Sequence, residues 1–164
     1  MKKNLVLLIL LLLILFVSYY SYKNKQDIIC STDVEQKIRD IDNNISKYSI
    51  ASKDIFDRST EGGQQTNYTL NEKNILIKQI FFGETGKSEI KYYFEANRVF
   101  YINKINTEYA LPIYEDSSGK VENVDLKEFY LDNNQNLCSW YLNQKLQLND
   151  GDAEDLIQSL ISDL

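Results

Sequence analysis

The sequence contains no histidine. This excludes catalytic arrangements in which a histidine activates a serine or cysteine nucleophile, and it excludes histidine-ligated zinc or haem. Only two cysteines, Cys30 and Cys138, are present, which are too few for a structural zinc site on their own. The sequence therefore predicts a protein that is not an enzyme and that needs no metal or other cofactor.

Basic residues are scarce relative to acidic ones, at 18 against 24. After residue 26 the balance is 14 basic against 24 acidic side chains, a net charge of −10. Such a surface repels phosphate backbones and anionic lipid headgroups, so we expect no nucleic-acid partner. Solubility is a simpler explanation for this charge than a basic partner.

The one long hydrophobic run lies near the N-terminus, where Lys2 and Lys3 precede Leu5 to Val17. This pattern is typical of export signals and N-terminal membrane anchors. The run suits a cleavable signal in length and is shorter than the roughly 20 residues that a spanning helix prefers. However, Ser18 to Tyr22 offers no good cleavage site and resembles an interfacial aromatic belt. We expect an uncleaved signal-anchor at 5–22, with a cleaved signal peptide as the alternative.

This interpretation divides the chain into four parts. Residues 1–4 form a cytoplasmic N-terminus, 5–22 the helix, 23–31 a linker and 32–164 an extracytoplasmic α+β domain. The expected topology is N-in, with the domain anchored outside a bacterial membrane. After cleavage the protein would instead be secreted or periplasmic. Cys30 lies too far beyond the apolar run to be a lipoprotein cysteine.

Two amphipathic helices are expected at the ends of the domain. Thr32 and Glu35 have the form of a capping box, and an apolar stripe then predicts a helix over roughly 33–48. The acidic residues of 152–155 favour the start of a second helix, which continues to Leu164. The two stripes consist of Val34, Ile38, Ile41, Ile45 and Tyr48, and of Leu156, Ile157, Leu160, Ile161 and Leu164.

Between these helices, the sequence repeats one plan three times: a short β-like run, a polar turn and a second run. This predicts an antiparallel β-meander of five to seven strands with the helices on one face. The expected fold class is therefore α+β. The three pairs of runs are 68–70 with 75–77, 92–94 with 99–102, and 129–131 with 137–142.

Two segments resemble ligand loops. Gly83 to Ser88 ends like a phosphate-binding loop, but Phe81 replaces its first glycine and a strand-like run follows, so we expect a β-turn and no nucleotide. We expect Gly62, Gly63, Gly83 and Gly86 to adopt positive φ in turns. Residues 149–155 resemble a calcium loop with a misplaced glycine, and helix capping explains them more simply.

Aromatic residues concentrate in the predicted hairpins. Adjacent strand residues point to opposite faces, so with helices on one face some tyrosines must lie on an open face. They would form a surface for a ligand or partner, or pair across strands on a solvated sheet. The candidate residues of this surface are Tyr92, Tyr93, Tyr101, Tyr130 and Trp140.

The two cysteines form a candidate disulfide. Cys30 precedes the first helix and Cys138 lies in the last predicted hairpin, and the two would meet if that helix packs across the sheet. Alternatively, Cys138 is a small core residue and Cys30 is free or pairs between chains.

The turn motifs Ser59-Thr60-Glu61-Gly62-Gly63 and Gly83-Glu84-Thr85-Gly86-Lys87 accompany the hairpins at 92–94 and 129–131. Together they resemble uncharacterised bacterial envelope proteins in which such motifs separate the strands of a β-meander, over about residues 55–142. The resemblance implies location and fold class, and it implies no activity.

The leading interpretation is a noncatalytic extracytoplasmic binding or structural module of the bacterial envelope. The alternative is an inhibitor or chaperone-like partner of another envelope protein, which would use the open aromatic face or a sheet edge. A hydrolase that uses paired carboxylates is a third interpretation, for which the sequence selects no pair.

Overall fold

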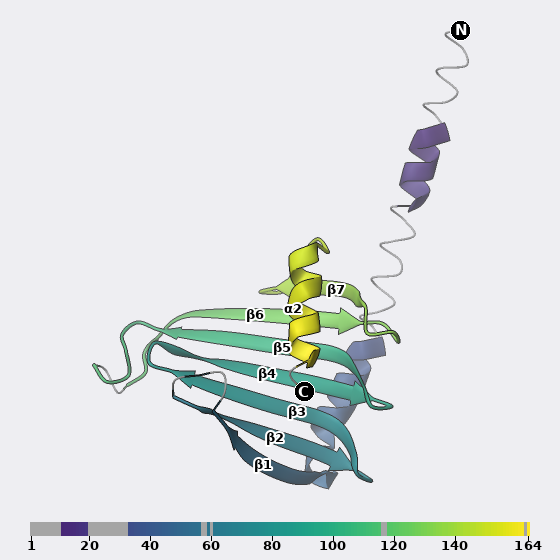
Figure 1. Ribbon diagram of the computed structural model, residues 1–164. Helices are drawn as coiled ribbons and strands as arrows, with labels where there is room; N and C mark the ends of the chain where they lie inside the picture. Colours follow the sequence, from purple (N-terminus) through teal and green to yellow (C-terminus); the bar gives the residue numbers. More distant parts are fainter. Residues whose placement is uncertain (1–10, 20–32, 57–58, 60, 116–117, 163) are drawn as a thin grey trace.

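The computed structural model describes residues 11–19, 33–56, 59, 61–115, 118–162 and 164. Within them, eight strands form one antiparallel sheet whose spatial order is the chain order (Figure 1). This confirms the α+β meander, with one strand more than the largest number expected. The strands are β1 (Ser49–Ile55), β2 (Gly63–Leu70), β3 (Lys73–Gly83), β4 (Gly86–Glu95), β5 (Arg98–Tyr109), β6 (Val121–Leu131), β7 (Leu137–Leu142) and β8 (Lys145–Leu146).

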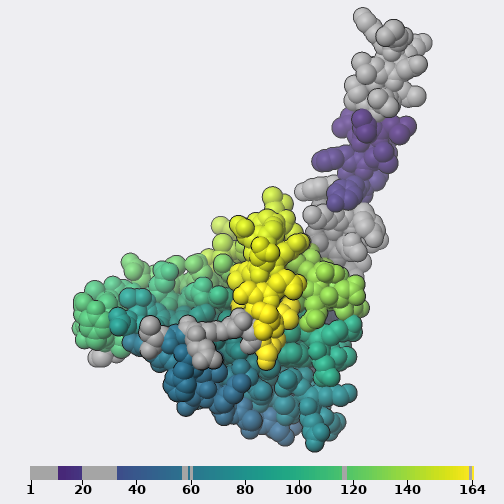
Figure 2. All heavy atoms as spheres, viewed as in Figure 1, coloured from purple at the N-terminus to yellow at the C-terminus, as the bar shows by residue number. Residues whose placement is uncertain are grey.

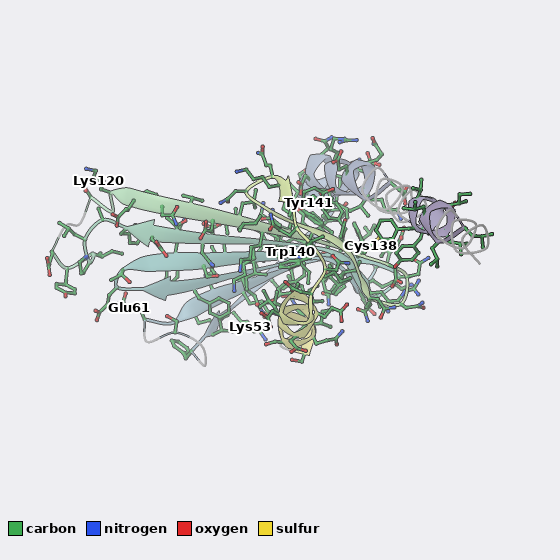
Figure 3. The ribbon with its side chains drawn as sticks, turned by 90° about the horizontal axis from the view of Figure 1, so that it is seen from above. Lys53, Glu61, Lys120, Cys138, Trp140 and Tyr141 are labelled. Atoms are coloured by element: carbon green, nitrogen blue, oxygen red, sulfur yellow. The ribbon has the colours of Figure 1, made fainter. Side chains whose placement is uncertain are left out.

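Two helices flank the sheet. The first occupies residues 33–43 and is followed by the 3-10 turn η1 (Ile45–Lys47); the second is α2 (Gly151–Ser162). They lie on opposite faces of the sheet, as Figure 3 shows from above. The prediction that both helices share one face is therefore wrong.

The helices cover opposite faces because both faces of the central strands are apolar. Tyr92 and Tyr93 are neighbours in β4, point to opposite faces and are 0% and 2% exposed. The α2-side core is completed by Ile157 and Leu160 of α2. The other core includes Val34, with Ile38, Ile41 and Ile45 packed against it. The predicted stripes thus form the contacts expected of them, on separate faces.

The three predicted hairpins are confirmed as β2–β3, β4–β5 and β6–β7. Three turns have two central residues at positive φ, the geometry that matches strand twist in a tight hairpin. None of these six residues is glycine, although the left-handed region favours glycine. The pairs are Asn71 with Glu72, Ala96 with Asn97, and Asn143 with Gln144.

The glycines serve another purpose than predicted. Of the four named above, Gly62 alone has a positive φ, of 77°. Gly63 and Gly86 instead allow close approach, because a Cβ would overlap the carbonyl oxygens of Ile80 and Thr107, respectively. The phosphate-loop-like segment forms the β3–β4 hairpin turn and continues as strand β4, as expected. Its Lys87 Nζ lies 2.6 Å from Glu89 Oε1.

The predicted location at a membrane is corrected. Residues 11–19 of the apolar segment are helical, and the rest of 5–22 lies outside the described residues. At 1.5 Å per residue the nine described residues span about 14 Å, less than half of a hydrocarbon core of about 30 Å. No helix within the described parts of the chain is long and apolar enough to cross a membrane.

Candidate functional site on the distal half of the sheet

The two helices lie over one half of the sheet, and in the other half most side chains are half-buried or exposed. We call the end with turns 71–72, 96–97 and 132–136 proximal, and the end with turn 84–85 and connection 110–120 distal; Glu61 and Lys120 mark the distal end in Figure 3. In Figure 2 the teal and green atoms of the distal strands lie at the surface to the left of α2. Strand β6 shows the contrast: residues 129–131 are buried, whereas 121–124 are exposed.

On the α2 side of the sheet, one row of residues runs across seven strands at the border between the two halves. The register pairs Lys53 with Gln65, Gln65 with Gln79, Gln79 with Ile90, and so on. We call this the lysine row, since three of its members are lysines. Its members are Lys53, Gln65, Gln79, Ile90, Lys104, Lys127 and Leu142.

The glutamines of the lysine row form a buried, hydrogen-bonded floor. Gln79 Nε2 donates to Gln65 Oε1 at 2.9 Å, and the Tyr92 hydroxyl donates to Gln79 Oε1 at 3.3 Å. Gln65 Nε2 in turn donates to Asn67 Oδ1 at 2.8 Å. Buried amides with such partners hold fixed rotamers, so this part of the row is rigid.

Lys104 and Lys127 lie directly opposite each other on β5 and β6, and both are half-buried. Burial, together with the charge of Lys127, lowers the pKa of Lys104 below its usual 10.5. Among the described residues, neither lysine forms an ion pair. Like charges directly opposite on a sheet are destabilising, so the fold itself gives no reason for this pair.

The next row towards the distal end is polar from β4 to β6, whereas its β3 member is Phe81. The Ser88 hydroxyl donates to Asn106 Oδ1 at 2.9 Å, and Asn106 pairs in register with Asp125. Asp125 Oδ1 accepts from Asn143 Nδ2 at 3.2 Å. The lysine pair thus lies between an apolar core on its proximal side and hydrogen-bonding groups on its distal side.

The opposite face carries a ladder of packed tyrosines. Ring centroids of Tyr93 and Tyr101 are 5.5 Å apart, and those of Tyr101 and Tyr130 are 5.0 Å apart. The Tyr93 hydroxyl donates to Asp42 Oδ1 at 3.2 Å and that of Tyr101 to Glu128 Oε1 at 2.6 Å. Burial first, then the neighbouring carboxylates, raises the pKa of all three phenols.

The predicted aromatic partner surface is therefore wrong. All four of its tyrosines are at most 5% exposed, and Trp140 is half-buried. Tyr92 and Trp140 lie under α2, and the others lie under the helix at 33–43. The prediction assumed one covered face, and the second helix buries the residues that it left open. Sequence reasoning missed Lys104 and Lys127, because only the β5–β6 register shows that they lie directly opposite each other.

Cys138 is disulfide-bonded. It is partly buried against the core on the side of the helix at 33–43. Cys30 lies outside the described residues, so its pairing with Cys138 stays a prediction.

A cavity of about 350 Å³ lies between the start of α2 and the β6–β7 turn, lined by Asn136, Leu137, Glu154, Asp155, Ile157 and Gln158. Asp150 Oδ1 accepts from the Ala153 amide at 2.9 Å and so caps α2. This confirms helix capping for the calcium-loop-like segment. Across the described chain, no group of three or more potential protein ligands is placed to hold a metal ion.

The chain matches no family model, no curated protein and no solved structure.

Proposed function

We propose that the protein is a noncatalytic binding module that uses the distal half of the sheet, on the α2 side, as its binding surface. One observation carries this proposal: a half-buried pair of like charges lies at the border of the half of the sheet over which neither helix lies. Two buried, hydrogen-bonded glutamines lie in the same row, separated from the pair by Ile90. Unfavourable charge arrangements that the fold does not require are typical of functional surfaces.

The surroundings favour binding over chemistry. The carboxylates Asp42, Asp125 and Glu128 accept hydrogen bonds from a tyrosine, an asparagine and a tyrosine, respectively. Asp42 and Glu128 belong to the opposite face from the lysine row. The proposed surface therefore offers positive charge and hydrogen bonds, without a pair of carboxylates that converges on one substrate.

Chemical-shift mapping by NMR tests this proposal. The native protein would be titrated with a mixture of anionic, cationic and neutral metabolites. We expect the perturbed amides to cluster at 79–90, 104–108 and 123–127. Perturbations confined to the cavity at the start of α2, or conversion of a metabolite into product, would contradict the proposal.

A second candidate, an inhibitor or chaperone-like partner of another protein, draws support from the edge strand β1. Its residues are nearly all exposed, and among the described strands it pairs with β2 alone. Such an edge can accept an added strand from a partner. Along an edge strand, successive backbone N–H groups point alternately to the neighbouring strand and to solvent. Of the two variants Ala51→Pro and Ser52→Pro, one therefore removes an N–H group that points to solvent and leaves the hydrogen bonds to β2 intact. Loss of a partner in that variant, at unchanged stability, would favour this candidate.

A further inference from the structure

We propose that Lys104 and Lys127 together bind a doubly charged oxyanion, namely the phosphate or sulfate group of a small ligand. This inference rests on the proposed function, since it names the class of ligand for the same surface.

The first step is the placement of the two lysines. They are register partners on β5 and β6, so their Cβ atoms lie about 5 Å apart on one face. Buried Ile90 pairs with Lys104 on one side, and half-buried Leu142 pairs with Lys127 on the other. The aliphatic parts of both lysine side chains thus have apolar neighbours. The two ammonium groups find polar surroundings only towards the distal end of the sheet.

The second step is charge. Two ammonium groups this close repel each other, and partial burial strengthens the repulsion. In the described structure, neither has a carboxylate within ion-pair distance. The carboxylate nearest along these rows is that of Asp125, which accepts from Asn143. A dianion between the two lysines would neutralise both, and lysine is a common point-charge ligand of phosphate.

The third step is the additional hydrogen-bonding capacity of the next row. Ser88 and Asn106 are joined at 2.9 Å in the row beside Lys104. A hydroxyl and an amide can both donate to phosphate oxygens once their mutual bond is exchanged. The site thus combines two charges with neutral donors, as oxyanion sites require.

The opposite face supplies a matched control. Lys78 and Lys91 are also register partners, on β3 and β4. Their surroundings differ, since Glu89 occupies the next row and forms an ion pair at 2.6 Å with Lys87, which lies one row further. Glu128 lies in the row of Lys78 and Lys91 itself. Lys91 pairs with Asn103 on β5, and Asn103 pairs with Glu128 on β6. The control pair thus has one carboxylate in its own row and another in the next row, whereas Lys104 and Lys127 have none in their row and Asp125 in the next. The additional carboxylate reduces the attraction of the control pair for an anion.

The test is a calorimetric titration of the intact protein with inorganic phosphate, repeated with sulfate, at constant ionic strength. We expect saturable one-to-one binding, weakened about tenfold or more in Lys104→Gln/Lys127→Gln, in line with the loss of hydrogen bonds to charged groups. Lys78→Gln/Lys91→Gln removes the same charge and should leave affinity within about twofold. The charge-preserving double variant Lys104→Arg/Lys127→Arg should retain binding and guards against a folding defect.

Absence of saturable binding to the native protein would overturn the inference, as would equal losses in the two glutamine pairs. In either case, the proposed function would still hold if uncharged metabolites perturb the NMR signals of amides in the distal half. Perturbed amides elsewhere would remove both.

Discussion

The proximal and distal halves of this sheet are built from the same strands but are stabilised differently. In the proximal half, large side chains on both faces are buried under helices, and each face forms its own core. In the distal half, most side chains of β3 to β6 are half-buried or exposed, although Thr107 of β5 is buried. The comparison shows how a small domain can stabilise one half of a sheet and leave the other available for binding.

The largest expected effect concerns the disulfide of the proximal half. We predict that Cys30 is the partner of Cys138, so that the bridge closes a ring spanning residues 30–138. Removing a ring of this size should lower the free energy of unfolding by about 4–5 kcal/mol in the ideal case. Urea unfolding of Cys30→Ser, Cys138→Ser and the double variant should give equal losses. A Cys30→Ser variant as stable as the native protein, or a reductant-sensitive dimer, would contradict the pairing.

The second prediction compares two residues of β6. Phe129 is 0% exposed and stacks on Trp140 at 5.8 Å, whereas Val124 is 48% exposed. Phe129→Ala should lower the free energy of unfolding by about 3–5 kcal/mol because it opens a cavity. Val124→Ala should change it by about 0.5 kcal/mol or less. Urea unfolding measures both, and similar losses would mean that the two halves do not differ as described.

The third prediction is a loss of proximal stability at alkaline pH. The folded-state pKa values of Tyr93, Tyr101 and Tyr130 are raised, first by burial. Their contribution is complete below about pH 10 and is lost at higher pH, because the unfolded chain then releases phenolic protons that the folded one keeps. Three such groups should remove about 2–4 kcal/mol by about pH 11.

Urea unfolding on either side of pH 10, with tyrosinate absorbance recorded in parallel, measures this loss. Tyr101→Phe should make the dependence on pH shallower. Stability that stays constant over this range, with tyrosinate forming in the folded protein, would show that the phenols are accessible.

The smallest effect concerns the backbone of the distal half. A Cβ on Gly86 would overlap the Thr107 carbonyl oxygen on β5, so Gly86→Ala should lower the free energy of unfolding by about 1–3 kcal/mol. At Gly83 the nearest atom would be 3.4 Å away, and Gly83→Ala should cost about 0.5 kcal/mol or less. Thermal melting of both variants tests the comparison. Equal losses would show that the turn, and not the approach of β4 to β5, sets the requirement for glycine.

The hairpins were predictable because their signals are local. Short runs such as 92–94 and 99–102 have strand composition, and the polar residues between them form the turn. The helical stripes from Val34 and from Leu156 were equally readable, because helical periodicity appears within one segment. The short N-terminal apolar run led to a wrong prediction because it, too, was interpreted from local composition. Its composition indicated a membrane helix, whereas no helix among the described residues is long and apolar enough to cross a membrane.

The sequence alone thus determined the meander, the positions of the flanking helices and the exclusion of histidine-dependent chemistry. Which face each helix covers was decided by tertiary structure, and with it the burial of Tyr93, Tyr101 and Tyr130. The meeting of Lys104 and Lys127 was decided there too, through the β5–β6 register. The physical reason is that alternation along a strand shows which residues share a face. It does not show what packs on that face, or which residue of the next strand lies opposite.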